Sequence, residues 1–175
     1  MLLISIGANA QVKFFDQTHE QINLIFDPNA SFKESGINIG TEFEYVYQGF
    51  YIKQGVQNFA VLKGGYTDLI TTFGTSFKVG KINNNRFYTG VRAGWILRGS
   101  QVYATGGFEA GFDYIFKNGL TIGVRTTRDY REDFKYSFAN PKSIQSVFIK
   151  IGYKINIKRK GRRLANPSEK TSKRL

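Results

Sequence analysis

Hydrophobic and polar residues alternate along residues 87–99, FYTGVRAGWILRG. Every second position carries a mostly apolar side chain: Phe87, Thr89, Val91, Ala93, Trp95 and Leu97. The positions between them carry two arginines and two glycines: Tyr88, Gly90, Arg92, Gly94, Ile96 and Arg98. A period of two places successive side chains on opposite faces of a β-strand. The stretch therefore predicts a strand with one apolar face and one charged face.

The same alternation recurs along the chain. It is strong in residues 37–47, 69–80, 102–116, 120–125 and 147–157, and weaker in residues 21–27 and 50–61. The last of these segments changes parity near Gly55, which indicates a β-bulge there. Together with residues 87–99, these segments predict eight strands.

The predicted connections differ in length at the two ends of the strands. Three are short and rich in turn residues: 48–49, 81–86 and 117–119. The others are 28–36, 62–68, the brief 99–101 and the long 128–143. Short turns at one end and longer loops at the other are typical of outer-membrane barrels, whose short turns face the periplasm and whose longer loops face outward.

The apolar faces can be buried in two ways. A soluble barrel of the lipocalin type turns them inward, whereas a membrane barrel turns them toward lipid and keeps polar faces inside. Here the apolar faces are continuous and rich in Phe and Tyr, while the polar faces carry Gly, Thr, Ser and charges of both signs. This favours an all-β, eight-stranded, antiparallel up-and-down transmembrane β-barrel over the soluble alternative.

The polar faces predict a cluster of charges in the barrel interior. Its members are Glu42, Glu44, Arg92, Arg98, Glu109, Asp113, Arg125, Lys150 and Lys154, together with Lys78. A turn centred on Asn118 opposes residues whose numbers sum to about 236, so Arg125 lies diagonal to Glu109. The tight connection at 99–101 likewise places Arg92 diagonal to Glu109. We expect these three side chains to meet.

Seven aromatic residues fall near the short-turn ends of their strands. They are Tyr45, Tyr47, Phe50, Phe87, Tyr114, Phe116 and Tyr153. Aromatic side chains gather in girdles where a membrane barrel meets the interface. We expect these residues to form a lipid-facing girdle on the periplasmic side.

Composition and charge define the segments outside the barrel. The chain has 175 residues, no Cys, and a net charge of +12, of which residues 158–175 carry +7. Residues 1–10 end in Ala-Asn-Ala and predict a signal-peptide remnant, with a buried first strand as the alternative. The expected organisation is therefore this remnant, a lead-in at 11–20, the barrel at 21–157 and a basic periplasmic tail at 158–175.

Candidate chemistry is sparse. His19 is the single histidine and lies outside the strong strands, so no serine has a histidine partner for nucleophilic catalysis. Glu42 and Glu44 are better explained as interior ion pairs than as an acid/base pair. Asp129, Glu132 and Asp133 are interleaved with arginines, which favours a solvated loop over a cation site. We expect no enzyme activity, cofactor or metal.

The strand spacing, alternating connections and charged interior of residues 21–157 resemble the small outer-membrane β-barrels of Gram-negative bacteria, of the OmpA/OmpX type and the PorT-like barrel-domain group. The resemblance implies a location in the outer membrane, with the lipid bilayer as the main partner. It also implies a non-enzymatic structural or interaction role, standing alone or as an accessory subunit of a larger envelope complex.

Two segments are expected to contact an envelope protein partner. The candidate contact residues are Arg128, Tyr130, Arg131, Phe134 and Tyr136 in the outer loop, and Arg159, Lys160, Arg162 and Arg163 in the tail. The tail lacks interleaved aromatics, so nucleic-acid binding is not expected. A solvated tail without a partner remains open, as do two other functions: a narrow solute channel and a soluble ligand-binding barrel.

Overall fold

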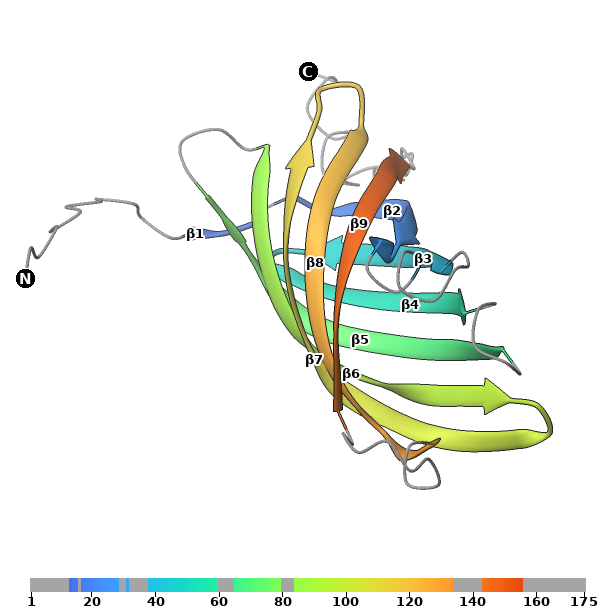
Figure 1. Ribbon diagram of the computed structural model, residues 1–175. Coiled ribbons are helices and arrows are strands. Elements are labelled where there is room, and N and C mark those ends of the chain that lie inside the picture. Colours follow the sequence, from blue (N-terminus) through green and yellow to red (C-terminus); the bar gives the residue numbers. More distant parts are fainter. Residues whose placement is uncertain are drawn as a thin grey trace, which may run out of the picture.

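Antiparallel strands make up almost all of the structure (Figure 1). The computed structural model describes residues 13–15, 17–28, 31, 38–59, 65–79, 84–133 and 143–155. The strands are β1 (Lys13–Phe14), β2 (His19–Phe26), β3 (Asn38–Tyr47), β4 (Phe50–Phe59), β5 (Tyr66–Lys78), β6 (Asn85–Arg98), β7 (Gln101–Ile115), β8 (Leu120–Arg131) and β9 (Ser143–Ile155). No helix of the described residues is long and apolar enough to cross a membrane.

Strands β2 to β9 close into an eight-stranded barrel. Each strand pairs with its neighbours in the sequence, and the β2–β9 pairing closes the ring. All pairings are antiparallel, so the predicted up-and-down barrel is confirmed. The short strand β1 was not predicted; it pairs with the end of β5 beyond the point where β4 stops.

The pairing register defines a narrow barrel. A row of paired residues starts at Lys78 of β5, runs once around the barrel and returns to β5 at Asp68, ten residues away. Ordinary strand spacings then tilt the strands by about 40° and separate opposite backbones by about 16 Å. An interior of this width is filled by side chains.

The lengths of the connections distinguish the two ends of the barrel. The β3–β4 turn has positive φ at Gln48 (45°) and Gly49 (88°), the signature of a tight type I′ hairpin. The turns at 48–49 and 116–119 lie at one end, which we call the short-turn end. The connections at 27–37, 60–65 and 132–142 lie at the other, the long-loop end, where β6 and β7 form the longest hairpin (Figure 1).

Three local predictions need correction. The register of β3 with β4 is uninterrupted, so the expected bulge at Gly55 is wrong; parity changes because Tyr51 points inward and Gln54 outward. Strand β6 begins at Asn85, which places Arg86 in a strand rather than a turn. Strand β8 continues to Arg131, well into the segment expected to be an outer loop.

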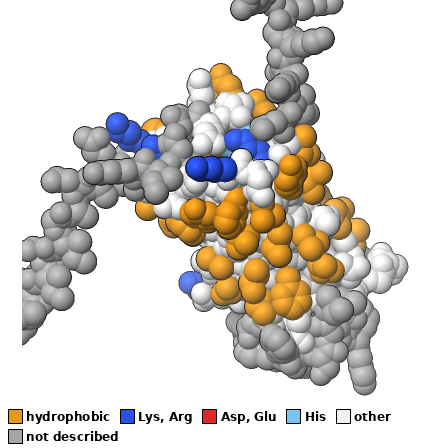
Figure 2. All heavy atoms as spheres, turned by 90° about the horizontal axis from the view of Figure 1, so that it is seen from above, with side chains coloured by type: hydrophobic (Ala, Val, Ile, Leu, Met, Phe, Trp, Pro, Cys, Tyr) orange, Lys and Arg blue, Asp and Glu red, His pale blue; other side chains and the backbone are white. Residues whose placement is uncertain are grey.

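The apolar faces point outward. Trp95, Phe108 and Phe73 expose 57%, 67% and 56% of their surface, whereas Arg125 and Glu109 expose 1% and 2%. Hydrophobic side chains gather over the barrel wall, with few Lys and Arg among them (Figure 2). The lipocalin arrangement, with an apolar cavity and charged exterior, is therefore wrong for this chain.

Candidate functional site

A first group of buried charges lies inside the barrel toward the short-turn end. Arg86 Nη2 lies 2.6 Å from Glu44 Oε1, and Arg86 Nη1 lies 3.5 Å from Asp113 Oδ2. Lys150 Nζ lies 2.6 Å from the same Asp113 oxygen and 3.7 Å from Glu44 Oε2. All four side chains are fully buried, so each charge depends on its partners rather than on water.

A second group lies beside the first. Glu109 is paired with Lys53 and lies 3.4 Å from Arg125 Nη1, while Tyr51 donates its hydroxyl to Glu109 Oε1 at 2.8 Å. Arg125 also pairs with Glu42. Charge-assisted bonds of this kind are the strongest hydrogen bonds in proteins, and they link β3, β4, β7 and β8 across the interior.

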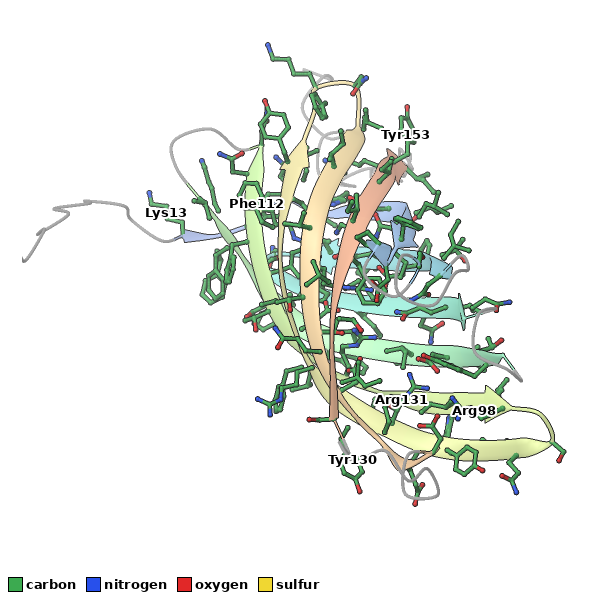
Figure 3. All side chains as sticks on the ribbon, viewed as in Figure 1. Lys13, Arg98, Phe112, Tyr130, Arg131 and Tyr153 are labelled. Carbon is green, nitrogen blue, oxygen red and sulfur yellow. The ribbon has the colours of Figure 1, made fainter. Side chains whose placement is uncertain are left out.

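A third group lies toward the long-loop end. Arg131 bonds Asp68 through Nη1 at 3.0 Å and Asp133 through Nε at 3.2 Å. Arg98 Nη2 lies 3.3 Å from Asp133 Oδ2. The side chains of Arg98 and Arg131 lie near each other at this end, far from Tyr153 at the opposite end (Figure 3).

The interior charges are balanced. Among the described residues, the interior ion pairs involve seven carboxylates, Glu42, Glu44, Asp68, Glu109, Asp113, Asp129 and Asp133, and seven cations, Lys53, Arg86, Arg92, Arg98, Arg125, Arg131 and Lys150. An isolated ion in a dry interior is very costly, whereas a neutral, fully paired set is tolerated.

Aromatic rings fill the space between these groups. Tyr88 is fully buried and Tyr51 nearly so, and their rings meet edge to face at 5.6 Å. Lys53 Nζ lies 4.3 Å from the centre of the Tyr88 ring, close enough for a cation–π contact. Gly111 faces the Tyr88 ring, and a side chain there would collide with it.

The N-terminal segment covers the short-turn end. Phe15 is 1% exposed and donates its backbone N–H to the Ser76 carbonyl at 3.0 Å. Its ring lies 5.9 Å from the ring of His19 and 5.7 Å from the Arg86 guanidinium carbon. The lead-in therefore enters the barrel end and fills it with an aromatic side chain.

The structure places the predicted interior residues as follows. Buried inside are Glu42, Glu44, Arg92, Glu109, Asp113, Arg125 and Lys150, while Arg98, Lys78 and Lys154 are partly exposed near the barrel ends. Arg125 meets Glu109, in the predicted register in which residue numbers sum to 236. Arg92 instead lies 3.4 Å from Asp129, a partner that the sequence reasoning had placed in a loop.

Six charged residues of the interior were missed as interior groups. Lys53 lies in one of the two weaker predicted strands, Arg86 was assigned to a turn, and Asp68, Asp129, Arg131 and Asp133 were assigned to loops. Their parity was the available signal. Arg86 and Asp68 continue the even-numbered inward faces of β6 and β5 beyond the residues where the apolar pattern was read.

The predicted aromatic girdle points outward at the short-turn end. Tyr47, Phe50, Phe87, Tyr114, Phe116 and Tyr153 are exposed, and Tyr45 is half-buried. All lie within the three strand residues nearest the short-turn end, or in the adjacent turns. They therefore share one level of the outer wall.

The candidate partner contacts divide into three groups. Arg128 and Tyr130 lie on the outer face of β8. Arg131 is a correction: it is 4% exposed and points inside, because β8 carries its inward face up to that residue. Phe134, Tyr136, Arg159, Lys160, Arg162 and Arg163 lie outside the described residues, as do the segments 1–10 and 158–175.

A metal site is not evident in the described part of the chain, which contains no group of three or more potential metal ligands. Asp129 and Asp133 are paired with arginines, as expected for charges that do not bind a cation. The described interior is an ion-pair network.

Comparisons with known proteins agree with the fold. No family model matches the chain, and no curated protein does. A designed transmembrane β-barrel matches with a TM-score of 0.51 and 17% identity, over 80% of this chain and 97% of its own. The Yersinia pestis outer membrane protein Ail matches with a TM-score of 0.50 and 11% identity, over 79% of this chain and 100% of its own. The chain has the fold of the small eight-stranded transmembrane β-barrels.

Proposed function

We propose that the protein spans the outer membrane of a Gram-negative bacterium as a closed barrel with a structural or interaction role, alone or as an accessory subunit of an envelope complex. The observation that carries this proposal is the contrast between the two faces of the wall. The outside is apolar and the inside is a neutral, buried ion-pair network. Such a wall suits lipid outside and permits no continuous water column inside.

The outer wall also has the limits expected of a membrane band. The aromatic residues of the girdle, such as Tyr47 and Phe87, mark the edge of this band at the short-turn end. Asn58, Arg128 and Gln145 bring polar side chains onto the wall toward the long-loop end. We assign the short-turn end to the periplasm and the long-loop end to the cell exterior, as in barrels of this kind.

A two-part experiment tests the membrane role. The purified chain is refolded into phospholipid vesicles and reconstituted in planar bilayers, with a large-pore porin as positive control. We expect insertion that resists extraction by carbonate and no stepwise conductance above the bare bilayer. Stable folding in water without detergent would overturn the membrane role, and regular conductance steps would support the narrow-channel alternative.

The interaction role is tested by affinity capture from detergent-solubilised envelopes. The full chain is compared with a chain that lacks residues 158–175 and with the double variant Arg128→Ala, Tyr130→Ala on the outer face of β8. We expect a specific envelope protein to be captured by the full chain and lost from at least one of the two variants. Capture of the same proteins by all three chains and by an unrelated barrel would overturn this role.

A further inference from the structure

An amide side chain faces outward from the middle of the apolar wall. Gln54 is exposed on β4, whose neighbouring outward side chains are Ile52 and Val56. Within the described part of the chain, no group hydrogen-bonds the Gln54 side chain. It lies four positions along β4 from Phe50 of the girdle, so the strand tilt places it about 10 Å from the girdle toward the long-loop end. That level lies well inside a membrane band about 25 Å tall.

Small side chains continue from Gln54 across the wall. Gln54 pairs with Thr71, Thr71 with Ala93, and Ala93 with Gly106, so the four residues form one row across β4 to β7. The side chains shrink along this row to the bare backbone of Gly106. Because all four face outward, they form the floor of a furrow.

Larger apolar side chains border the furrow on both sides. One ridge is the paired row Ile52, Phe73, Val91 and Phe108, and the other is the paired row Val56, Leu69 and Trp95. Phe73, Trp95 and Phe108 are each more than half exposed. A depression of about 940 Å³ overlaps part of the furrow: Gln54, Thr71 and Ala93 line it together with the ridge of Val56, Leu69 and Trp95, and it continues past β4 to Phe43 and Ile22.

The energetic cost of Gln54 calls for a partner. An amide that faces hydrocarbon without a hydrogen bond loses several kcal/mol of hydration. The other polar residues at this level of the wall, such as Thr41 and Thr71, carry only hydroxyls. Transmembrane helices associate through small residues that let backbones approach and through polar groups that bond across the interface. The furrow beside Gln54 combines the same two features.

We propose that the furrow of Gln54, Thr71, Ala93 and Gly106 is the interface between two copies of this chain in the membrane. A two-fold axis along the membrane normal places the same residue of both copies at the same depth. A primary amide both donates and accepts, so two Gln54 side chains satisfy each other. The dimer rests on the membrane-spanning role proposed above.

The chemistry of the wall favours a second copy over other occupants. A lipid acyl chain fills the depression but leaves the amide without a hydrogen bond. A different membrane protein would need a polar group of its own at this depth. In a homodimer the two-fold symmetry places a second Gln54 there.

Cysteine cross-linking tests the position of the interface. The chain contains no Cys, so a single introduced thiol reports on one place. Thr71→Cys lies in the furrow, and Thr126→Cys is the matched control, an outward threonine on β8 away from it. In vesicles we expect an oxidant to convert Thr71→Cys into a disulfide-linked dimer at least about ten times faster than Thr126→Cys. Equal rates would overturn the proposal.

Energy transfer between labelled copies tests the role of the amide. Donor- and acceptor-labelled chains are diluted in phospholipid vesicles and compared with Gln54→Leu and with the control Gln145→Leu on the outer face of β9. We expect Gln54→Leu to weaken self-association about 3- to 30-fold, as for loss of a polar contact between membrane segments. The control should leave association unchanged.

Each outcome has a distinct meaning. Chains that insert but show no transfer beyond random proximity overturn the dimer and leave the membrane role standing. Chains that fail to insert overturn the membrane role itself. Cross-linking of Thr71→Cys in native envelopes to a different polypeptide, in place of a second copy, assigns the furrow to another occupant and overturns the proposal.

Discussion

The ion pairs of the barrel interior predict a large effect of neutralising Glu109. Glu109→Gln keeps the size of the side chain and the acceptor for the Tyr51 hydroxyl, but it removes the negative charge that faces Lys53. Arg125 retains Glu42, whereas the only described ion pair of Lys53 is with Glu109. Lys53 is 1% exposed, so its charge is left in the interior without an ion-pair partner among the described residues. Breaking a buried pair in this way costs about 3–5 kcal/mol of unfolding free energy.

A double-mutant cycle isolates the cause. Lys53→Met leaves Glu109 with Arg125 and Tyr51, so it should cost less than Glu109→Gln. The double variant removes both charges, and its cost should fall short of the sum of the single costs by at least about 2 kcal/mol. Glu20→Gln, on the outer side of β2, is the control and should cost less than about 0.5 kcal/mol.

Urea unfolding of the barrel in phospholipid vesicles measures these free energies. Trp95 is the single tryptophan and is 57% exposed on the outer wall, so its fluorescence reports loss of the lipid-facing structure. A cost below about 1 kcal/mol for Glu109→Gln, or strictly additive costs in the cycle, would show that water screens these charges. Either result would refute the picture of a dry, paired interior.

Three further substitutions and one control test the packing of the barrel in the same unfolding assay. Gly111→Ala should cost about 1–3 kcal/mol because its methyl group meets the Tyr88 ring, whereas Gly106→Ala, whose methyl group meets nothing closer than 3.4 Å, should be tolerated. Phe15→Ala should cost about 3–5 kcal/mol by emptying the short-turn end; a cost below 1 kcal/mol would show that the N-terminal segment does not hold that end closed. Asp68→Asn should cost about 1–3 kcal/mol, less than Glu109→Gln, because the arginine it pairs with keeps a second carboxylate; an equal cost would contradict this ranking.

Local patterns indicated the eight barrel strands and most of their inward and outward faces. The alternation in residues 87–99 places Val91 and Trp95 on the lipid-facing side and Arg92 inside, as the structure has them. The alternation depends on neighbours two residues apart, so it can be read without knowledge of the fold. It failed at Gly55 because an aromatic residue, Tyr51, faces inward and a polar one, Gln54, faces outward.

The residues at which strands begin and end were harder to predict from the alternation. Arg86 and Arg131 were assigned to connections because turn-forming or charged residues surround them in the sequence. In the structure Arg86 nevertheless pairs with residues of β5 and β7, which makes it part of β6. Arg131 pairs with Thr105 of β7, which makes it the last residue of β8. Tertiary hydrogen bonds decide where a strand ends, whereas composition alone only indicates where it weakens.

The amino-acid sequence by itself determined that this chain forms eight amphipathic strands with apolar sides suited to lipid and charges on the opposite sides. Only the tertiary structure decided which charges meet. Closing the barrel with an offset of ten residues brings Glu44 to Arg86 and Glu42 to Arg125, pairs far apart in the sequence. The registers of the adjacent pairs β4–β5, β5–β6 and β6–β7 likewise align Gln54, Thr71, Ala93 and Gly106 in one outward row. The reason is physical: alternation is a property of one strand, whereas partners across a barrel depend on how all the strands are staggered.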